Sequence, residues 1–433
     1  MGRLRENAGV YILWMLAVLP AVRWLMLQPL ESRFSEPFMV LTSIGQLLAL
    51  TGISLFALTL ILSGRFKFIE GYFGGMNKVY ANHHKYGAYA FVLLLFHPLS
   101  LAGAYAVFSL KDAFQFLVPA NNWAVNFGMV SLYSLMLLLV LTLFARVKYH
   151  NWKFTHQFMG VAFFFGALHA FLIPSDVSSD LALRIYVLGL AAVALAVYVY
   201  RTVLGRFLVR KADYAVETVR KLGDKAVEVE MAPLKQALSV KAGQFVFVSF
   251  HQQGVSPEAH PFSLTSSPSE KKLKIGVKAL GDYTKELADL KPGALARIEG
   301  PFGQFSKRYA PQKTQVWIAG GIGVTPFVSM AKDLKAQEKA DLYYCVNTLQ
   351  EAFFLPELEG IAQEKKGLRV MLWLTNEKGY LKAQDVEKES GPLSEKETFI
   401  CGPVPMMQKL KRQFYKKGVY DVHSEEFELA EEK

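Results

Sequence analysis

Residues 82–98, NHHKYGAYAFVLLLFHP, and residues 155–170, THQFMGVAFFFGALHA, decide how the rest of the chain is interpreted. Both stretches are apolar enough to enter a membrane, yet each holds a histidine near its start and another near its end. The histidines are His83 and His97 in the first stretch and His156 and His169 in the second. Because an imidazole is costly in hydrocarbon unless it is bound, the two pairs predict ligands for haem iron. Such a chain is expected to carry electrons across a bilayer.

Six segments of the first half are long and apolar enough, or nearly so, to cross a hydrocarbon core about 30 Å thick. They are residues 9–28, 38–63, 86–108, 124–146, 155–173 and 182–204. Residues 205–433 have the composition of an ordinary soluble protein, with many lysines and glutamates. The sequence therefore predicts a membrane α-helical bundle followed by a soluble part.

Basic residues concentrate in alternate connections between these segments. They are Arg3 and Arg5, then Arg65, Lys67, Lys78 and Lys85, then Arg146, Lys148 and Lys153, and finally Arg201, Arg206, Arg210 and Lys211. Because lysine and arginine are enriched in cytoplasmic loops, we expect both termini and the soluble part in the cytoplasm. No convincing cleavage site follows the first arginines, so we expect a retained helix rather than a signal peptide.

The spacing of the histidines bears on their geometry. His97 lies fourteen residues after His83, about 40° away around a helix, whereas the thirteen residues from His84 turn roughly 140°. This favours His83 and leaves His84 as the alternative. His156 and His169 are thirteen residues apart, so their helix needs a bulge, a kink or a different approach angle. Each pair spans roughly 20 Å, which allows two stacked haems; interfacial or hydrogen-bonded histidines are the other reading.

Three further residues of the apolar segments are candidates for a smaller role. Gly87 and Gly160 each lie four residues after a histidine, where a flat macrocycle could approach the backbone. Arg23, inside the first segment, is more typical of a packing or snorkelling residue than of a site. A haem propionate or an anionic substrate is its alternative partner.

The bulk composition argues against two other classes of protein. The net charge is +11, but the basic residues are dispersed and no basic cluster is interleaved with aromatic residues, so no nucleic-acid partner is expected. Cys345 and Cys401 are the two cysteines, and they lack metal-ligand spacing. Neither a disulfide framework nor a zinc site is therefore indicated.

Short alternating strands begin at about residue 212, and we predict them at Tyr214–Val219, Ala226–Met231 and Gly243–Phe250. Three motifs follow, namely HPFSLTSS at 260–267, VKALGDYT at 277–284 and GPFG at 300–303. An aromatic residue flanked by hydroxyl residues, with a glycine-led turn into a short helix, can give a flavin a stacking face and its pyrophosphate N–H donors. HPFS alone fits an ordinary strand end, whereas the three motifs in this order indicate a flavin site.

The next motif is VWIA at 316–319, followed by GGIGVTP at 320–326 and a helical run over 327–334. A strand, a glycine turn and a helix with threonine and proline at its start point free N–H groups at a phosphate. The turn is similar to dinucleotide-binding turns but lacks the G-x-G-x-x-G spacing, and an ordinary strand-to-helix turn is the alternative. Strands at 342–346, 370–374 and 398–401, with CGP at 401–403, complete a parallel α/β domain.

The ordered set of paired histidines, HPFS, GDYT, GPFG, GGIGVTP, CGP and a late aromatic residue resembles the ferric reductase and NADPH oxidase superfamily. The resemblance covers nearly the whole chain and is strongest to bacterial NADPH oxidase homologues. It implies a ferric-reductase-like bundle of six transmembrane helices over 1–208, fused to a ferredoxin-reductase-like module. That module would consist of a β-barrel FAD domain over 209–311 and an α/β NAD(P)H domain over 312–433.

The resemblance also implies roles for individual residues. His83 and His156 would bind the inner b-type haem, and His97 and His169 the outer one. The FAD site would contain His260, Pro261, Phe262, Ser263, Thr265, Lys278, Gly281, Tyr283 and Thr284. NADPH or NADH would lie on Gly320, Gly321, Gly323, Thr325, Pro326, Cys401, Gly402 and Pro403. Cys401 and Phe427 are the predicted catalytic residues, and Phe427 would stack on the flavin until the nicotinamide displaces it.

The implied reaction passes hydride from NAD(P)H to FAD on the cytoplasmic side of a bacterial plasma membrane, and then electrons through both haems to an outer acceptor. Oxygen would give superoxide and a ferric chelate would give ferrous iron. The short outer loops favour oxygen, and a quinone or a periplasmic partner is a further alternative. Membrane lipid is an expected contact, and no obligatory protein partner or regulatory domain is indicated.

Two positions depart from the pattern of the superfamily. Asn347 stands where many relatives have an arginine that can bind the 2′-phosphate, so the preference between NADPH and NADH stays open. Phe427 is followed by six more residues, so its role is less secure than that of a terminal aromatic residue.

Overall fold

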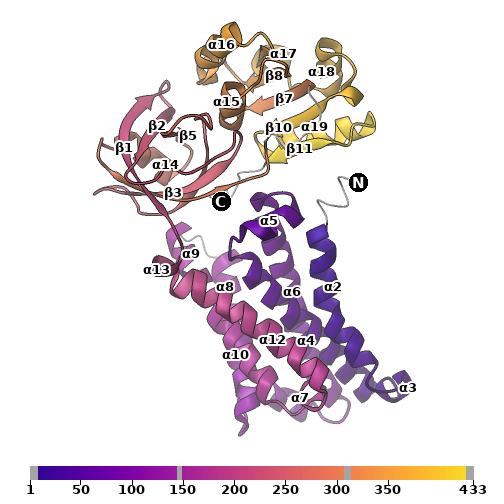
Figure 1. Cartoon of the computed structure of the whole chain (residues 1–433). Helices are drawn as coiled ribbons and strands as arrows, with labels where there is room; N and C mark the ends of the chain where they lie inside the picture. The colour runs from indigo at the N-terminus through magenta and orange to yellow at the C-terminus, as the bar shows by residue number, and fades with distance from the viewer. Residues whose placement is uncertain (1–7, 144–148, 307–313, 426–433) are drawn as a thin grey trace.

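The computed structural model describes residues 8–143, 149–306 and 314–425. A bundle of long helices forms one end of the molecule and two sheets form the other (Figure 1). We call the end of the bundle that faces the sheets the module end, and the opposite end the far end. Within the described ranges, six helices are long and apolar enough to span a membrane. This architecture confirms the predicted fold class.

The membrane spans follow the predicted segments. They are α2 (Ala8–Leu25), α4 (Pro37–Leu62), α6 (Met76–Ala106), α8 (Trp123–Leu143), α9 with α10 (Tyr149–Gln157 and Met159–Leu172), and α12 (Leu181–Tyr198) with its π-helical end η1 (Val199–Val203). Shorter helices lie in the connections, namely α3 (Leu30–Arg33), α7 (Leu110–Phe116) and α11 (Asp176–Ser179) toward the far end, and α5 (Lys67–Phe73) and α13 (Gly205–Leu208) toward the module end.

The third span differs from its prediction at its start. α6 begins at Met76, well before the predicted start at residue 86. Hydropathy detects only the apolar part of a helix, and the extra turns contain Asn77, Lys78 and Asn82, which favour water over hydrocarbon. As a consequence His83 lies within a continuous helix rather than near its first turn.

The fifth span is broken between its two histidines. α9 ends at Gln157 and α10 begins at Met159, with Phe158 outside both helices. The Phe158 N–H donates to the carbonyl of Thr155, three residues back instead of four, over 3.1 Å. A break of this kind rotates the following helix relative to the preceding one. The predicted irregularity between His156 and His169 is confirmed.

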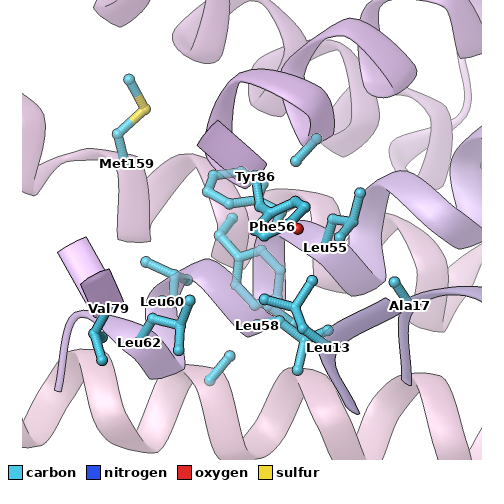
Figure 2. Close-up of a cluster of buried hydrophobic side chains, with 14 of the residues drawn as sticks. Leu13, Ala17, Leu55, Phe56, Leu58, Leu60, Leu62, Val79, Tyr86 and Met159 are labelled. Atoms are coloured by element: carbon cyan, nitrogen blue, oxygen red, sulfur yellow. The ribbon is translucent and has the colours of Figure 1, made fainter. Parts of the chain in front are cut away.

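The apolar core of the bundle continues into the soluble module. Figure 2 shows Leu13, Phe56 and Tyr86 lying together from three different spans, and Met159 of a fourth span belongs to the same buried cluster. The same buried cluster includes three aromatic side chains of the first sheet, Phe245, Phe247 and Phe302. Because apolar burial stabilises in proportion to the area removed from water, this shared core holds the bundle and the module together.

The first sheet is antiparallel and closes on itself. Its strands are β1 (Ala212–Lys221), β2 (Ala226–Pro233), β3 (Phe245–His251), β4 (His260–Ser263), β5 (Leu273–Lys278) and β6 (Leu295–Phe302), in the order β4-β3-β6-β1-β2-β5. A bridge between Leu264, just after β4, and Ile275 on β5 links the two edges. The sheet is therefore a small barrel, with helix α14 (Asp282–Glu286) and the 3₁₀ turn η2 (Leu287–Asp289) between β5 and β6.

The second sheet is parallel, with the order β11-β10-β7-β8-β9. Its strands are β7 (Thr314–Gly320), β8 (Lys339–Val346), β9 (Leu368–Leu374), β10 (Glu397–Cys401) and β11 (Val422–Glu425). Its helices are α15 (Thr325–Lys332), α16 (Leu355–Glu364), α17 (Thr375–Lys378), α18 (Ala383–Ser390) and α19 (Val404–Lys416), with 3₁₀ turns η4 (Gly321–Val324), η5 (Leu349–Glu351) and η6 (Leu393–Glu395). The chain order reverses between β7 and β10, which is the switch point where open α/β sheets bind ligands.

Candidate functional site

His83 and His156 face each other at the module end of the bundle. Their ring centres lie 6.2 Å apart and their planes are inclined by 74°. A bond between a metal and an imidazole nitrogen is about 2 Å long, so two imidazoles on opposite sides of one ion bring their ring centres roughly 6 Å apart. The pair therefore fits a bis-histidine iron. His84, the alternative, is exposed.

Backbone carbonyls orient three of the four histidines. The Nδ1–H group of His83 donates to the carbonyl of Thr59 over 2.8 Å, and that of His97 donates to the carbonyl of Gly45 over 2.9 Å. His169 donates to a carbonyl of α8, that of Ala124, over 2.7 Å. A proton held on Nδ1 leaves Nε2 free to bind a metal.

The remaining histidine differs in its surroundings. The Nδ1 atom of His156 is buried without a hydrogen-bond partner among the described residues. Its ring stacks on Trp152, one turn earlier in α9, with centres 5.2 Å apart. Packing rather than a hydrogen bond thus orients His156.

The glycines near the histidines have different surroundings. A Cβ atom on Gly128 of α8 would lie 2.9 Å from Nδ1 of His169, so this glycine makes room for the ring. A Cβ atom on Gly160 would overlap the ring of Tyr198, so this glycine packs against α12 and the macrocycle predicted to lie beside it has no room there. Gly87 has open space around it. Only the latter of the two predicted glycines leaves a surface for a flat ligand.

Arg23 is engaged with the protein itself. Its guanidinium donates to both oxygens of Asp180, over 3.2 and 2.7 Å. Arg33 likewise pairs with Asp176 over 3.2 Å and lies over the ring of Trp24. The two aspartates between the fifth and sixth spans are thus paired to residues in or just after the first span.

Two of the predicted flavin motifs meet in the barrel. The ring of His260 on β4 stacks on the ring of Tyr283 on α14, with centres 4.1 Å apart and planes inclined by 20°. Nε2 of His260 lies 2.8 Å from the Glu258 carboxylate. Burial lowers the pKa of His260 and the Glu258 charge opposes that shift. The structure therefore joins HPFS and GDYT in one place, although twenty-odd residues separate them in the chain.

The other predicted flavin contacts differ in their exposure and in their hydrogen bonds. Pro261 and Lys278 are partly exposed, Phe262 and Ser263 are buried on β4, and Gly281 caps α14. The Thr284 hydroxyl accepts from the N–H groups of Leu280 and Gly281 and so holds that turn closed. Thr265 is fully buried and its hydroxyl donates to Glu228 over 2.9 Å, so its place in the flavin site stays a prediction.

The two nucleotide motifs touch each other at the switch point. β7 and β10 pair in parallel with Ala319 opposite Cys401. A Cβ atom on Gly323 would collide with the carbonyl of Cys401, and one on Gly320 would collide with Pro403 and Met406. Gly321 has a φ of +53°, which glycine adopts without strain. The GGIG turn and CGP thus form one surface, next to the start of α15, where Thr325 and Pro326 lie.

Cys401 lies beneath this surface beside a buried glutamate. It is opposite Glu425 of β11 in the parallel register, and both side chains are almost fully buried. Burial first, and then the charge of Glu425, raises the pKa of the Cys401 thiol well above its ordinary value. The thiol is therefore held in its neutral form. Phe427, the other predicted catalytic residue, lies outside the described residues.

A second buried glutamate reaches this place from the bundle. Glu70 of α5 accepts hydrogen bonds from the backbone N–H groups of Gly303 over 2.6 Å and of Met76 over 3.0 Å. Burial raises the pKa of Glu70, and burial together with the charge of Glu70 raises that of Glu425. In Figure 1, α5 rises from the bundle toward β11. Two carboxyl groups are thus buried near each other where the bundle meets the module.

A third glutamate anchors the barrel. Glu299 of β6 accepts two hydrogen bonds from Arg201, over 2.7 and 2.8 Å, and one from Arg65 over 3.2 Å. The Arg65 guanidinium also lies 3.6 Å from the centre of the Phe247 ring. Although burial alone would raise it, the hydrogen bonds and charges of the arginines hold the pKa of Glu299 below its ordinary value. The carboxylate is therefore an ionic link between two spans and the barrel.

Comparison with known protein families follows this division of the structure. Residues 48–167 match the family described as ferric reductase like transmembrane component. Residues 212–320 match an FAD-binding domain, and residues 317–412 match an oxidoreductase NAD-binding domain. The three matches occur in the order bundle, barrel and α/β domain. Together, the three matches support the ferric reductase and NADPH oxidase superfamily.

The curated relatives that this chain matches are longer than it is. NADPH oxidase 1 of Mus musculus is 30% identical over 196 residues, which is 42% of this chain and 32% of the relative. Dual oxidase 2 of Rattus norvegicus is 31% identical over 151 residues, or 30% of this chain and 10% of the relative. The chain thus spans about a third or less of the curated relatives it matches.

A solved structure supports the fold of this chain. The flavohemoglobin from Malassezia yamatoensis with bound FAD and heme aligns over 90% of this chain and 98% of its own, with a TM-score of 0.51 and 20% sequence identity. At this identity the likeness concerns the fold alone.

Several contacts of the site carry no sequence signal. The carbonyls of Thr59, Gly45 and Ala124 orient histidines through the backbone, so their side-chain identities do not reveal them. Glu70 and Glu299 resemble ordinary surface glutamates in the sequence. Only the three-dimensional meeting of bundle and module distinguishes them.

Proposed function

We propose that the chain passes electrons from NAD(P)H on the cytoplasmic side, through FAD and two b-type haems, to oxygen on the outer side, where superoxide forms. The observation that carries this proposal is the facing pair His83 and His156 at the end of the bundle docked to the flavin barrel. A pair of histidines that can bind iron thus lies next to a domain that matches FAD-binding domains.

The residues present fit the groups that this function requires. The inner haem would be held by His83 and His156, whose rings face each other, and the outer haem by His97 and His169. FAD would lie along His260, Pro261 and Tyr283 of the barrel, and the nicotinamide nucleotide would lie on the surface formed by GGIG and CGP. When bound, FAD would accept hydride and release single electrons, and haem iron would relay them.

The chain's own groups position these sites. Glu299, with Arg65 and Arg201, fixes the barrel against the ends of the second and sixth spans. Glu70 fixes the GPFG segment through the N–H of Gly303. The shared apolar core beside these polar contacts excludes water from the path between flavin and inner histidines. Fixed distance and low dielectric are what electron transfer between bound groups needs from the protein.

The orientation follows from charge. Arg65, Lys67, Arg201 and Arg206 lie at the module end or in the connections that reach it, and the positive-inside rule assigns that end to the cytoplasm. Both chain termini and the dehydrogenase module would then lie in the cytoplasm, with the outer histidine pair toward the far end. We infer residence in a plasma membrane, of bacterial type by the resemblance of the sequence.

Oxygen is the acceptor that the far end favours. The connections at this end are short, and Asp176 and Asp180 are each paired with an arginine. A ferric chelate is the second candidate, because residues 48–167 match the ferric reductase like component. A quinone or a periplasmic partner would need a further binding surface.

The acceptor can be decided with purified holoprotein in micelles. We expect NAD(P)H-driven reduction of cytochrome c that superoxide dismutase abolishes, at a rate above that of anaerobic Fe(III)-chelate reduction. Iron reduction that outpaces superoxide formation would overturn the oxidase assignment. Turnover that requires added quinone or a protein fraction would assign the chain to a relay instead.

A further inference from the structure

The carboxyl end of β8 lies beside the glycine turn that would hold a dinucleotide phosphate. β7 and β8 pair in parallel, with Gly320 opposite Cys345. The residues just after Val346 therefore lie at the same edge of the sheet as the glycine turn that follows β7. In open α/β sheets this edge binds the nucleotide, and the strand next to the glycine turn meets its adenosine ribose. The first residues after β8 would therefore lie near the 2′ position of that ribose.

Those residues form a small polar network centred on a carboxylate. Oε2 of Glu351, on η5, accepts from the side-chain amide of Asn347 over 3.1 Å and more weakly from its backbone N–H over 3.4 Å. The Thr375 hydroxyl, just after β9, donates to the Asn347 side-chain oxygen over 2.9 Å. Both donor groups of Asn347 are thus committed to Glu351, and the carboxylate is held at the edge of the sheet.

This network suits a hydroxyl better than a phosphate. A carboxylate accepts a hydrogen bond from the 2′-hydroxyl of NADH, whereas the 2′-phosphate of NADPH carries about two negative charges and repels it. Arg369, the arginine on neighbouring β9, is bonded to Asp341 near the opposite end of the sheet. Lys378 of α17 lies over the ring of Trp373 on β9. It is the cation nearest to Thr375 along the chain, and is therefore the alternative partner for a 2′-phosphate.

We propose that Glu351, held by Asn347, makes this chain select NADH over NADPH. This inference rests on the proposed function, because it assumes that the second domain delivers hydride from a nicotinamide nucleotide. It differs from what the name of one curated relative, NADPH oxidase 1, states of that protein. Glu351 acts as a specificity residue at the ribose and has no part in hydride transfer.

The first test is flavin reduction in the intact, cofactor-loaded protein without oxygen. Stopped-flow bleaching of the flavin by each nucleotide gives the two efficiencies, and we expect NADH to exceed NADPH by about tenfold or more. Glu351→Gln should raise the efficiency with NADPH about threefold to tenfold and lower that with NADH. Asn347→Arg should shift the ratio further toward NADPH. Glu359→Gln, the same change on an exposed position of α16, should leave the ratio unchanged.

A binding measurement separates this inference from the proposed function. Calorimetry with adenosine 2′-phosphate and adenosine 5′-phosphate needs no turnover, and Glu351→Gln should tighten only the 2′-phosphate. The inference is overturned if the wild type prefers NADPH, if Glu351→Gln changes both nucleotides equally, or if Lys378→Gln removes a strong preference for NADPH. Flavin that neither nucleotide reduces would contradict the proposed function instead, while the two adenosine phosphates would still report on Glu351.

Discussion

Arg201, at the end of the last membrane span, donates two hydrogen bonds to Glu299 on β6 of the flavin barrel, 2.7 and 2.8 Å long. The side chains are only 15% and 11% exposed, so water competes weakly for either partner. The paired fork of an arginine fixes direction as well as distance. This contact sets how the barrel sits on the bundle, and hence where a flavin would lie relative to His83 and His156.

Removing the Glu299 carboxylate should therefore slow electron transfer from flavin to haem more than reduction of the flavin. Glu299→Gln removes the negative charge that faces the buried guanidinium groups of Arg65 and Arg201, which weakens docking by about 3–5 kcal/mol. We expect flavin reduction by the nicotinamide nucleotide to persist while haem reduction slows, both followed by stopped-flow absorbance. Glu217→Gln, a half-exposed glutamate on β1, is the matched control. Equal slowing of both steps would refute the positioning role of Glu299.

Haem content distinguishes the two neighbouring histidines of α6. His83→Ala should remove about half of the haem absorbance, because one of two bis-histidine sites loses a ligand. His84→Ala should remove none, since His84 is exposed and His83 is the residue that faces His156. Pyridine haemochrome assay of both purified variants measures this. Loss of haem from His84→Ala, with none from His83→Ala, would show that His84 is the ligand of the inner haem instead.

The outer histidine can be disturbed without touching any ligand. A methyl group at Gly128 would lie 2.9 Å from Nδ1 of His169, where this nitrogen donates to Ala124. Gly128→Ala should displace the ring and shift the midpoint potential or occupancy of one haem only, as seen by spectroelectrochemical titration. Gly189→Ala on α12 adds the same methyl where nothing lies within 4 Å, and should change neither haem. Equal effects of both substitutions would mean that Gly128 has no special relation to His169.

The buried glutamates at the junction predict a pH dependence. Burial raises the pKa of Glu70, and burial with the charge of Glu70 raises that of Glu425, both relative to the unfolded chain. Groups with raised pKa values contribute stability that is present in acid and lost as pH rises through the raised values. We expect the melting temperature of the module to fall from about pH 5 toward about pH 8.

Substitutions of Glu70 and Glu425 test whether these two residues cause the pH dependence of the melting temperature. Glu70→Gln keeps an oxygen for the N–H groups of Gly303 and Met76 but cannot ionise. The melting temperature of this variant should therefore fall less with rising pH than that of the wild type, by about 2–4 °C for each kcal/mol of pH-dependent stability that is removed. Glu425→Gln should act in the same direction. Glu389→Gln, at an exposed position of α18, should keep the wild-type slope. A slope that survives both buried substitutions would show that other groups cause it.

The sequence predicts the parts of this protein whose signals are local. Apolar length locates the six spans, and glycine spacing locates the nucleotide turn. The start of α6 at Met76 was missed because polar helical turns outside hydrocarbon have no hydropathy signal. β11 was missed as a strand because its four residues, Val422–Glu425, take their conformation from pairing with β10.

Long-range contacts of polar side chains were beyond prediction. Glu299 and Arg201 are 98 positions apart, and Glu70 and Gly303 are 233 positions apart, so no periodicity links them. The resemblance places Thr265 at the flavin, and no local pattern reveals that its hydroxyl also bonds Glu228 on β2. In these cases tertiary packing, not local pattern, decides what a side chain contacts.

The central claim is a transmembrane electron path from a nicotinamide nucleotide to two haems, and one spectrum tests it directly. The purified, cofactor-loaded protein is mixed anaerobically with NADH and the reduced-minus-oxidised difference spectrum is recorded. The account predicts b-type haem bands from two haems per chain, reduced after the flavin bleaches, with half of the signal lost in His97→Ala or His169→Ala. A spectrum without b-type bands, or haem that stays oxidised while the flavin is fully reduced, would contradict it.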